Sequence, residues 1–322
     1  MKNVVLLVFF VLGMLSGILL ANLNSRSQDS PRQIRQGGYS LINPLLECEI
    51  ESQQRKKELI TIQYKLEEMV NQMKQKHNIS EMSIYLRDLN NGPWIGIDEN
   101  KEFSPASLLK IPVMIAYYST AESNPAILNK KVVYTGNTNL NANENIKPSN
   151  AIEKGKEYTI NELIRRMIVY SDNDAMAILV ENLPLSIQDK VYKDLGLSIP
   201  GVKGLEDYMT VREYASFFRI LYNASYLSRE YSQKALELLS EVDFDKGIRA
   251  GVPSNIRVAN KFGERNFQGQ KQLHDCGIVY YPNNPYLLCI MSRGDDFAEM
   301  SQSIKEVSAL VYREFDNLKK SK

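Results

Sequence analysis

The sequence has few of the residues on which metal centres and histidine-based catalysis depend. Its 322 residues include three cysteines and two histidines. The cysteines (Cys48, Cys276 and Cys289) form no CxxC pair and the histidines (His77 and His274) are isolated, which argues against a tetrahedral zinc site. A Ser-His-Asp triad would have only two candidate bases, so a serine activated by a lysine is the nucleophile system to look for.

Excess charge is also absent, because 39 lysines and arginines against 38 acidic residues leave a formal net charge of +1. Such a balance gives no electrostatic footprint for nucleic acid. Hydrophobic residues make up 43% and charged residues 24%, which excludes disorder over the whole length and a polytopic membrane protein. The length allows one large domain or two ordinary domains of about 150 residues each.

One long apolar run stands at the N-terminus. Residues 4–21 carry no charge and, as a helix, would span about 27 Å, close to the thickness of a bilayer core. Lys2 precedes the run and no clear small-x-small cleavage site follows, so we expect an uncleaved membrane anchor rather than a cleaved signal peptide. Either interpretation exports the rest of the chain: residues 1–22 are the anchor or signal, 23–57 a polar linker and 58–319 an extracytoplasmic domain. The protein would be a single-pass cell-membrane protein, or secreted if the segment is cleaved.

The remaining pattern predicts a mixed α/β (α+β) domain of two lobes. In chain order it indicates a helix from Glu58, a hairpin of residues 82–89 and 94–97, helices over 105–242, a hairpin of residues 274–282 and 286–292, and a helix over 298–315. We therefore expect an antiparallel sheet built from both chain ends, facing an all-helical lobe, with a cleft where the lobes meet.

A serine and a lysine one helical turn apart, Ser107 and Lys110, stand at the start of the segment FSPASLLKIPVMIAYY. Ser104 can cap this helix, and Pro105 suits its first position. A serine hydroxyl is a weak nucleophile until a neighbour takes its proton, which a lysine of lowered pKa in a partly desolvated cleft can do. The alternative is that both residues merely decorate a helix start, and an isolated SxxK would favour it.

A second polar motif, Ser171-Asp172-Asn173, lies between two apolar helices, the first of which begins with the capping box Thr159–Glu162. Buried polar groups need hydrogen-bond partners, so short polar side chains are costly here unless they have a task. Ser171 could pass a proton to a leaving group, and the amide of Asn173 could hold a substrate carbonyl. The alternative is an ordinary Asx cap between helices.

The third motif, Lys261-Phe262-Gly263, follows alternating β-branched residues and is therefore expected on a strand. Lys261 could bind a carboxylate and raise the local positive potential, and Gly263 would let a substrate backbone approach closely. The alternative for Lys261 is an exposed charge on an edge strand.

The three motifs in this order resemble those of the class A β-lactamases and penicillin-binding proteins, a superfamily of serine hydrolases. The flanking segments SLLKIPVMIAYY, TINELIRRMIVYSDNDAMAIL and GIRAGVPSNIRVANKFG are similar to the class A side, and the resemblance covers residues 58–319. It implies the β-lactamase-like two-lobe fold and acyl transfer without a metal or organic cofactor. It also implies a small-molecule or cell-wall peptide substrate.

The resemblance implies a role for each matching residue. Ser107 would attack an amide or ester carbonyl and form an acyl-enzyme, with Lys110 as base or proton relay and Ser171 as proton donor to the leaving group. The oxyanion hole would consist of two backbone N–H groups, those of Ser107 and Glu264. The residues that bind or orient the substrate would be Asn173, Lys261, Gly263 and Glu264.

Two departures from the family pattern bear on the substrate. Phe262 stands where the family has threonine, so a hydroxyl that helps to bind a substrate carboxylate is missing; Arg265 or Lys271 could compensate, or be solvated surface charges. No E-x-x-L-N segment, whose glutamate activates the deacylating water in class A β-lactamases, occurs between the second motif and Thr210. Glu206 lies in this stretch, but nothing around it marks it as a base. We therefore expect ready acylation by a β-lactam or a D-alanyl-type amide or ester, and weak deacylation.

Two other functions stay open. One is a D,D-carboxypeptidase or peptidase of peptidoglycan, which would use the same serine chemistry. The other is a non-catalytic envelope binding protein on the same fold, which Phe262 and the missing loop glutamate favour. The intact serines, lysines and asparagine of the three motifs oppose it. The sequence does not indicate an oligomeric state.

The cysteines add one structural expectation. If the PNNP turn is centred on its two asparagines, Cys289 faces Ile278 rather than Cys276. Buried free thiols are therefore expected at both positions, and Cys48 could be free as well.

Overall fold

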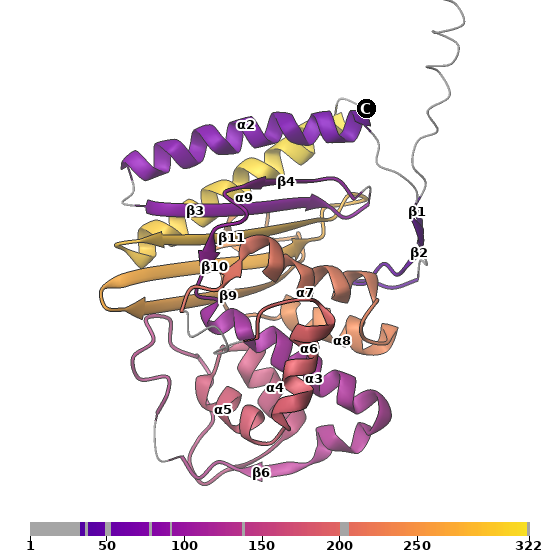
Figure 1. Ribbon diagram of the computed structural model, residues 1–322, viewed down its shortest axis with the longest axis vertical. Helices are drawn as coiled ribbons and strands as arrows, with labels where there is room; N and C mark the ends of the chain where they lie inside the picture. Colours follow the sequence, from indigo (N-terminus) through magenta and orange to yellow (C-terminus); the bar gives the residue numbers. More distant parts are fainter. Residues whose placement is uncertain are drawn as a thin grey trace, which may run out of the picture.

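The computed structural model describes residues 33–35, 38–48, 53–76, 79–90, 92–136, 139–199 and 206–320 (Figure 1). A five-stranded antiparallel sheet lies at its centre, in the order β4-β3-β11-β10-β9. The strands are β3 (Ile79–Asp88), β4 (Trp94–Ile97), β9 (Val258–Phe267), β10 (Gln270–Val279) and β11 (Tyr286–Gly294). The first two and the last three come from opposite ends of the chain, as predicted, and β9 is an edge strand.

Each face of the sheet carries its own apolar layer. On one face pack α2 (Gln53–Lys76), α9 (Phe297–Lys320) and the short 3-10 helix η3 (Ile248–Gly251). The helical part of the molecule covers the other face, so the sheet separates it from α2 and α9 in Figure 1. Because both faces are covered, successive residues along the inner strand β11 are buried regardless of the face to which they point.

Helix α3 (Lys110–Ser123) is the core of the helical part and is buried continuously from Lys110 to Tyr118. A helix that is apolar all round requires neighbours on all sides. The other helices of this part are η1 (Ala106–Leu109), η2 (Pro125–Asn129), α4 (Ile160–Val169), α5 (Asn173–Glu181), α6 (Leu185–Asp194), α7 (Val211–Asn223) and α8 (Arg229–Ser240).

Short two-stranded ladders join the connecting segments. They pair β1 (Gln33–Arg35) with β2 (Leu45–Cys48), β5 (Glu102–Phe103) with β8 (Met209–Thr210), and β6 (Lys131–Val133) with β7 (Glu157–Thr159). The capping box expected at Thr159 and Glu162 is present at the start of α4. It satisfies backbone N–H groups that a helix N-terminus otherwise leaves unpaired.

The expectation of free thiols on the last hairpin is wrong. Cys276 on β10 and Cys289 on β11 are cross-strand partners and form a disulfide. The hairpin pairs Val279 with Tyr286, so its centre lies one residue earlier than the two asparagines of the turn. Moving the centre by one residue moves every cross-strand partner by two, which exchanges Ile278 for Cys276 as the partner of Cys289.

The predicted membrane anchor, residues 1–22, lies outside the described residues. Within the part of the chain that the structure describes, no helix combines the length and apolar character needed to cross a membrane. The predicted linker is structured in part, because β1, β2 and the beginning of α2 fall within residues 23–57. Leu41 and Ile42 are buried, and their amides donate to Gln233 Oε1 on α8 at 3.1 and 3.2 Å.

Candidate active site

Ser107 and Lys110 lie on either side of the point where the 3-10 helix η1 continues as the α-helix α3. Ser107 lies in η1 and Lys110 is the first residue of α3, so the two side chains stand one turn apart. Pro105 occupies the N-cap position of η1 and no side chain caps it, so the cap predicted at Ser104 is wrong. The Ser104 hydroxyl instead accepts a hydrogen bond from Arg265 (2.8 Å), which ties the segment to β9.

The sheet behind Ser107 holds the preceding segment. The His274 Nε2–H donates to the carbonyl of Ser104 (2.9 Å), because Nδ1 of the same ring already accepts from the amide of Ser292 (3.2 Å). Burial lowers the pKa of His274 to about 4, so the ring is a neutral support rather than a base. Ala106, directly before the serine, has a φ of +48°, a left-handed conformation that non-glycine residues rarely adopt.

Gly263 lets β9 approach η1. A Cβ atom at this position would lie 3.0 Å from the Pro105 carbonyl oxygen and 3.0 Å from Leu108 Cγ. A side chain here would therefore push the strand that carries Lys261 away from the turn that carries Ser107. The protein itself fills the space that the sequence interpretation reserved for a substrate backbone.

The Lys110 amine is the centre of the site. Its Nζ lies within hydrogen-bond distance of four oxygens: Ser107 Oγ (2.8 Å), Ser171 Oγ (2.9 Å), the Ser171 carbonyl (2.6 Å) and Asn173 Oδ1 (2.6 Å). The ammonium form can donate to three of them at a time, and the neutral amine can instead accept from the Ser107 hydroxyl. The side chain is fully buried, and burial lowers its pKa to about 7 against the opposing charge of nearby carboxylates, Glu144 first. An amine that is partly neutral at pH 7 and in contact with a serine hydroxyl can accept the proton of that hydroxyl.

Ser171 joins the two lysines. Lys261 Nζ donates to Ser171 Oγ (2.9 Å) and to the carbonyl of Phe262 (3.0 Å), and its side chain is buried on the edge strand rather than exposed. Burial, reinforced by the charge of Lys110, lowers the pKa of Lys261 well below its ordinary value. Since the Ser171 hydroxyl contacts both amines, it can carry a proton between them and a substrate.

The middle residue of the second motif has a structural task. Asp172 is buried and caps α5 by accepting from the amides of Asp174 (2.9 Å) and Ala175 (3.3 Å). Its other carboxylate oxygen accepts from the amide of Ile152 (2.7 Å). The Asx-cap interpretation therefore holds for Asp172, whereas its two neighbours in the sequence contact Lys110.

Two carboxylates complete the site: that of Glu144, a residue the motifs did not indicate, and that of Glu264, for which only the backbone N–H had been assigned a role. The Asn173 amide donates to Glu144 Oε1 (2.7 Å), so both ends of this amide are engaged within the protein. Glu264 Oε1 accepts from the backbone N–H of Ile146 (2.6 Å), which fastens the loop that carries Glu144 to β9. Burial, together with the charge of Glu144, raises the pKa of Glu264 to about 7. Glu144 lies in the aperiodic segment NLNANENIKP, where no spacing marks a functional residue.

Phe262 makes its edge of the site apolar. Its ring stacks on that of Phe244 with centroids 4.4 Å apart. Lys261 Nζ lies 4.1 Å from the centroid of the Phe262 ring, so the face of an aromatic ring lies beside the ammonium group. A hydroxyl donor at this position is thus replaced by a buried ring that offers no hydrogen bond to a substrate carboxylate.

The cations considered as replacements for that hydroxyl are engaged elsewhere. Arg265 forms an ion pair with Glu206 (2.8 Å), and Lys271 donates to the carbonyl of Asp295 (2.6 Å). Glu206, the acidic residue of the loop that lacks the family glutamate, is half exposed in this ion pair. Both residues are half-buried and held by these contacts, so neither is a free solvated charge.

The structure brings most of the predicted side chains into one cluster of hydrogen bonds. Its members are Ser107, Lys110, Ser171, Asn173 and Lys261. Gly263 supports this cluster through packing. The backbone N–H groups of Ser107 and Glu264 stay a prediction as oxyanion donors.

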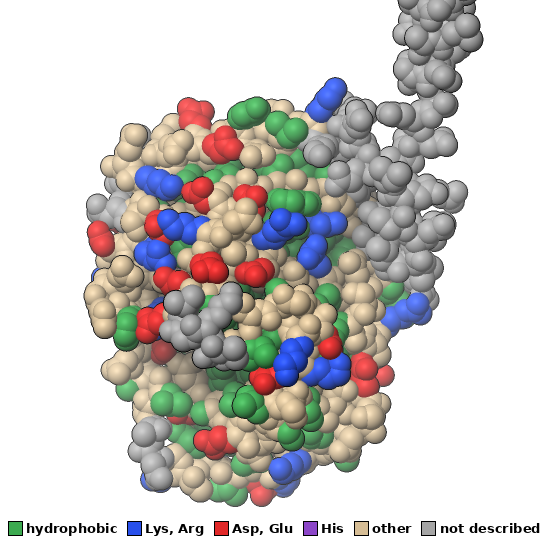
Figure 2. All heavy atoms as spheres, in the orientation of Figure 1, with side chains coloured by type: hydrophobic (Ala, Val, Ile, Leu, Met, Phe, Trp, Pro, Cys, Tyr) green, Lys and Arg blue, Asp and Glu red, His purple; other side chains and the backbone are tan. Residues whose placement is uncertain are grey.

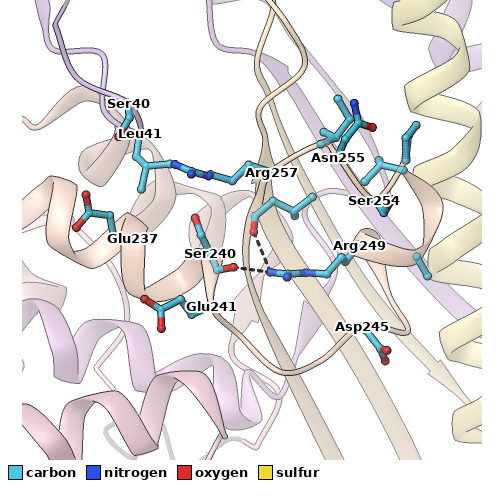
Figure 3. Close-up of a pocket in the computed structure, with 15 residues that line it drawn as sticks. Ser40, Leu41, Glu237, Ser240, Glu241, Asp245, Arg249, Ser254, Asn255 and Arg257 are labelled. Carbon is cyan, nitrogen blue, oxygen red and sulfur yellow. Dashed lines mark hydrogen bonds between the residues drawn. The ribbon is translucent and has the colours of Figure 1, made fainter.

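A pocket of about 940 Å³ lies elsewhere, between α8, η3 and the start of β9 (Figure 3). Arg249 crosses it and donates to the carbonyls of Ser240 (2.8 Å) and Val258 (3.1 Å). None of the residues that line this pocket belongs to the lysine and serine cluster, so its size does not locate the chemistry.

Comparisons with known proteins agree with this geometry. A model of the beta-lactamase enzyme family matches residues 65–315 of the chain. No curated protein sequence matches it. Among solved structures, a mutant of PBP-A in an acyl-enzyme complex with penicillin G superimposes with a TM-score of 0.66 at 19% identity, covering 80% of this chain and 97% of that one.

Two β-lactamase structures are similar to the same extent. The class A β-lactamase from Mycobacterium abscessus has a TM-score of 0.64 at 20% identity, covering 78% of this chain and 98% of that one. The β-lactamase from Sphaerobacter thermophilus has a TM-score of 0.62 at 21% identity, covering 73% and 92%. At these identities the likeness establishes a shared fold.

Proposed function

Since the chain belongs to the beta-lactamase enzyme family, we propose that it is a serine hydrolase that forms an acyl-enzyme on Ser107 with a β-lactam or a D-alanyl-type amide or ester. The observation that carries this proposal is the contact of 2.8 Å between the Ser107 hydroxyl and the buried Lys110 amine, whose pKa is lowered to about 7. A nucleophile beside a base of matched pKa is the arrangement that acyl transfer requires.

The contacts support the following sequence of proton transfers. Ser107 Oγ attacks the carbonyl carbon, and its proton passes to Lys110 Nζ. The C–N or C–O bond breaks when the leaving atom takes a proton from Ser171 Oγ, which recovers one from the Lys110 amine at 2.9 Å. Lys261 contacts the same oxygen and supports it with a further donor. The product is an ester between Ser107 and the acyl group.

We further propose that hydrolysis of this ester is slow. Within residues 173–199 and 206–210, which the structure describes, no carboxylate is hydrogen-bonded to Ser107 or Lys110. The carboxylates of this stretch are bound elsewhere: Asp174 accepts a hydrogen bond from the backbone amide of Leu140 (3.0 Å), and Glu206 forms an ion pair with Arg265. A deacylating water would therefore lack the loop base that class A enzymes use.

Intact-mass analysis after exposure to a fluorescent penicillin tests both parts of the proposal. Wild-type protein should gain one adduct per chain, and the adduct should persist long after free penicillin is removed. Ser107→Ala should gain none. Ser123→Ala, the same change at the exposed end of α3, should label like the wild type.

The outcomes separate the alternatives. Failure of the wild type to label, while an active penicillin-binding protein labels in parallel, contradicts acylation and favours the non-catalytic binding protein. Multiple turnovers without a persistent adduct contradict slow deacylation and make the protein a working β-lactamase.

A second candidate function is a D,D-peptidase of peptidoglycan. The likeness to PBP-A, whose structure holds penicillin G as an acyl-enzyme, favours it alongside the missing loop base. Incubation with D-alanyl-D-alanine-terminated muropeptides distinguishes the two functions, because only a peptidase releases D-alanine from them.

We also propose that the domain acts outside the cytoplasm, attached to the membrane through residues 4–21. The disulfide between Cys276 and Cys289 supports export, because such bonds persist in oxidising compartments. Protease treatment of intact cells followed by membrane fractionation tests it: the domain should be cleaved without lysis and otherwise sediment with membranes.

A further inference from the structure

Three arginines gather on the outer side of the molecule, away from the catalytic cluster. Arg87 lies near the end of β3. Arg212 and Arg219 lie two turns apart on α7, which packs against β3 and its neighbour β11. Figure 2 shows Lys and Arg side chains gathered between the C-terminal end of β3 and α7 on the face in view. We refer to these three residues as the arginine cluster.

An aromatic pair holds two members of the cluster in place. Trp94 is the cross-strand partner of Arg87, and its ring stacks on that of Tyr85 with centroids 5.4 Å apart. The Arg212 guanidinium lies 4.8 Å from the centre of the Trp94 ring, and Arg87 donates to the Tyr85 hydroxyl (3.4 Å). These contacts orient the guanidinium groups without neutralising their charge.

Among the described residues, none of the three arginines of the cluster forms an ion pair with a carboxylate. Arg165, Arg265 and Arg293, by contrast, each do.

Arg219 is the most constrained member. It is partly buried, donates to Ser216 Oγ (2.9 Å), and its Nε–H is buried without a protein acceptor. Burial, together with the positive charges of Arg87 and Arg212, lowers the pKa of its guanidinium, with only the Tyr85 phenol opposing them. Three like charges held together with an unused buried donor are unfavourable unless an anion joins them.

We propose that the arginine cluster is a binding site for a phosphate group, carried by an anionic ligand such as a lipid headgroup or a soluble phosphate compound. Phosphate matches the site because it carries up to two negative charges and several oxygens, which planar guanidinium groups bind in pairs of hydrogen bonds. The proposal does not depend on the proposed catalytic function, since no residue of the arginine cluster is hydrogen-bonded to Ser107, Lys110 or Lys261.

Binding of inorganic phosphate to the full-length protein tests the site. Isothermal titration at fixed ionic strength, with chloride as the competing anion, should show saturable binding to the wild type. Arg212→Gln and Arg219→Gln should each bind about tenfold more weakly or worse, as expected for the loss of a charge-assisted donor. Arg313→Gln removes the same charge from an exposed position on α9, across the sheet, and should bind like the wild type. If Arg219→Gln fails to fold, the exposed Arg212 still provides the test.

Vesicles identify the source of the phosphate. Because the apolar N-terminal segment would bind any bilayer, the quantity to compare is the extra binding that phosphatidylglycerol adds over phosphatidylcholine alone. Loss of this increment in Arg212→Gln, and not in Arg313→Gln, indicates a lipid headgroup. Phosphate binding without an increment indicates a soluble ligand. The proposal is overturned if phosphate does not bind, or if all three variants weaken it equally, which would show a general effect of charge.

Discussion

The acylation rate should follow the protonation of Lys110. With its pKa near 7, the neutral fraction of the amine is about 0.1 at pH 6, about 0.5 at pH 7 and about 0.9 at pH 8. At the ordinary lysine pKa of 10.5, the neutral fraction at pH 7 would be only about 3 × 10⁻⁴. The burial of this side chain therefore accounts for a factor of roughly a thousand in the supply of base at neutral pH.

The measurement is the second-order rate constant for acylation by a fluorescent penicillin, recorded by stopped flow between pH 5.5 and 9. The constant should rise about tenfold per pH unit below pH 6, about fivefold between pH 6 and 7, and level off above pH 8, because only the neutral amine accepts the Ser107 proton. Lys110→Ala should lose both the rate and the rising limb.

Glu264 provides the matched control, since its pKa is also about 7. Glu264→Gln removes that titration and also one of the negative charges that raise the pKa of Lys110, so the rising limb should persist but move to lower pH. A profile that is flat, or that keeps rising to pH 9, would refute the assignment of Lys110 as the base. The assignment would also be refuted if the rising limb of the pH profile persisted in Lys110→Ala, or if it disappeared in Glu264→Gln.

Three further predictions follow from the same contacts. Ser171→Ala should fold normally but acylate about a hundredfold more slowly in the stopped-flow assay, since the relay between the amines and the leaving group is lost; an unchanged rate would contradict the relay. Gly263→Ala should lower the free energy of unfolding in urea by about 1–3 kcal/mol and slow acylation, because its Cβ would meet Pro105 and Leu108; a neutral effect would show that β9 and η1 can separate freely. His274 should make the wild type less stable on acidification: the unfolded chain protonates this ring below pH 6.5 but the folded chain only near pH 4, so up to about 3 kcal/mol is lost between those values. Urea titrations of His274→Gln should lack that part of the pH dependence.

Residues that are close in sequence, or that follow a regular period, could be predicted well. Ser107 and Lys110 are one turn apart in any helix, so their contact follows from local geometry alone. The two hairpins and the helices at each end of the domain followed from alternation and helical spacing. The contact of Ser171 with Lys110, and that of Lys261 with Ser171, followed from the family resemblance, since no local rule relates positions so far apart.

The errors arose where a contact depends on the placement of a single residue or on an irregular loop. The Cys276–Cys289 disulfide was missed because the hairpin centre was misplaced by one position. Glu144 was missed because its segment has no periodicity, and only the folded loop brings it to Asn173. Ser104 was taken as a helix cap, but its carbonyl and hydroxyl are bound by side chains from distant strands.

The burial of Lys110 also fixes when the protein becomes reactive during its biogenesis. An unfolded chain exposes this amine to water, where it stays protonated and leaves the serine unactivated. Ser171, which contacts Lys110, and Lys261, which contacts Ser171, are synthesised later. The strand that carries Lys261 joins a sheet whose other strands come from both chain ends. Nucleophilic power therefore emerges only after the whole domain has assembled. Under the proposed function, penicillin labelling would then double as a reporter of completed folding, and an incompletely folded chain would be protected from acylation.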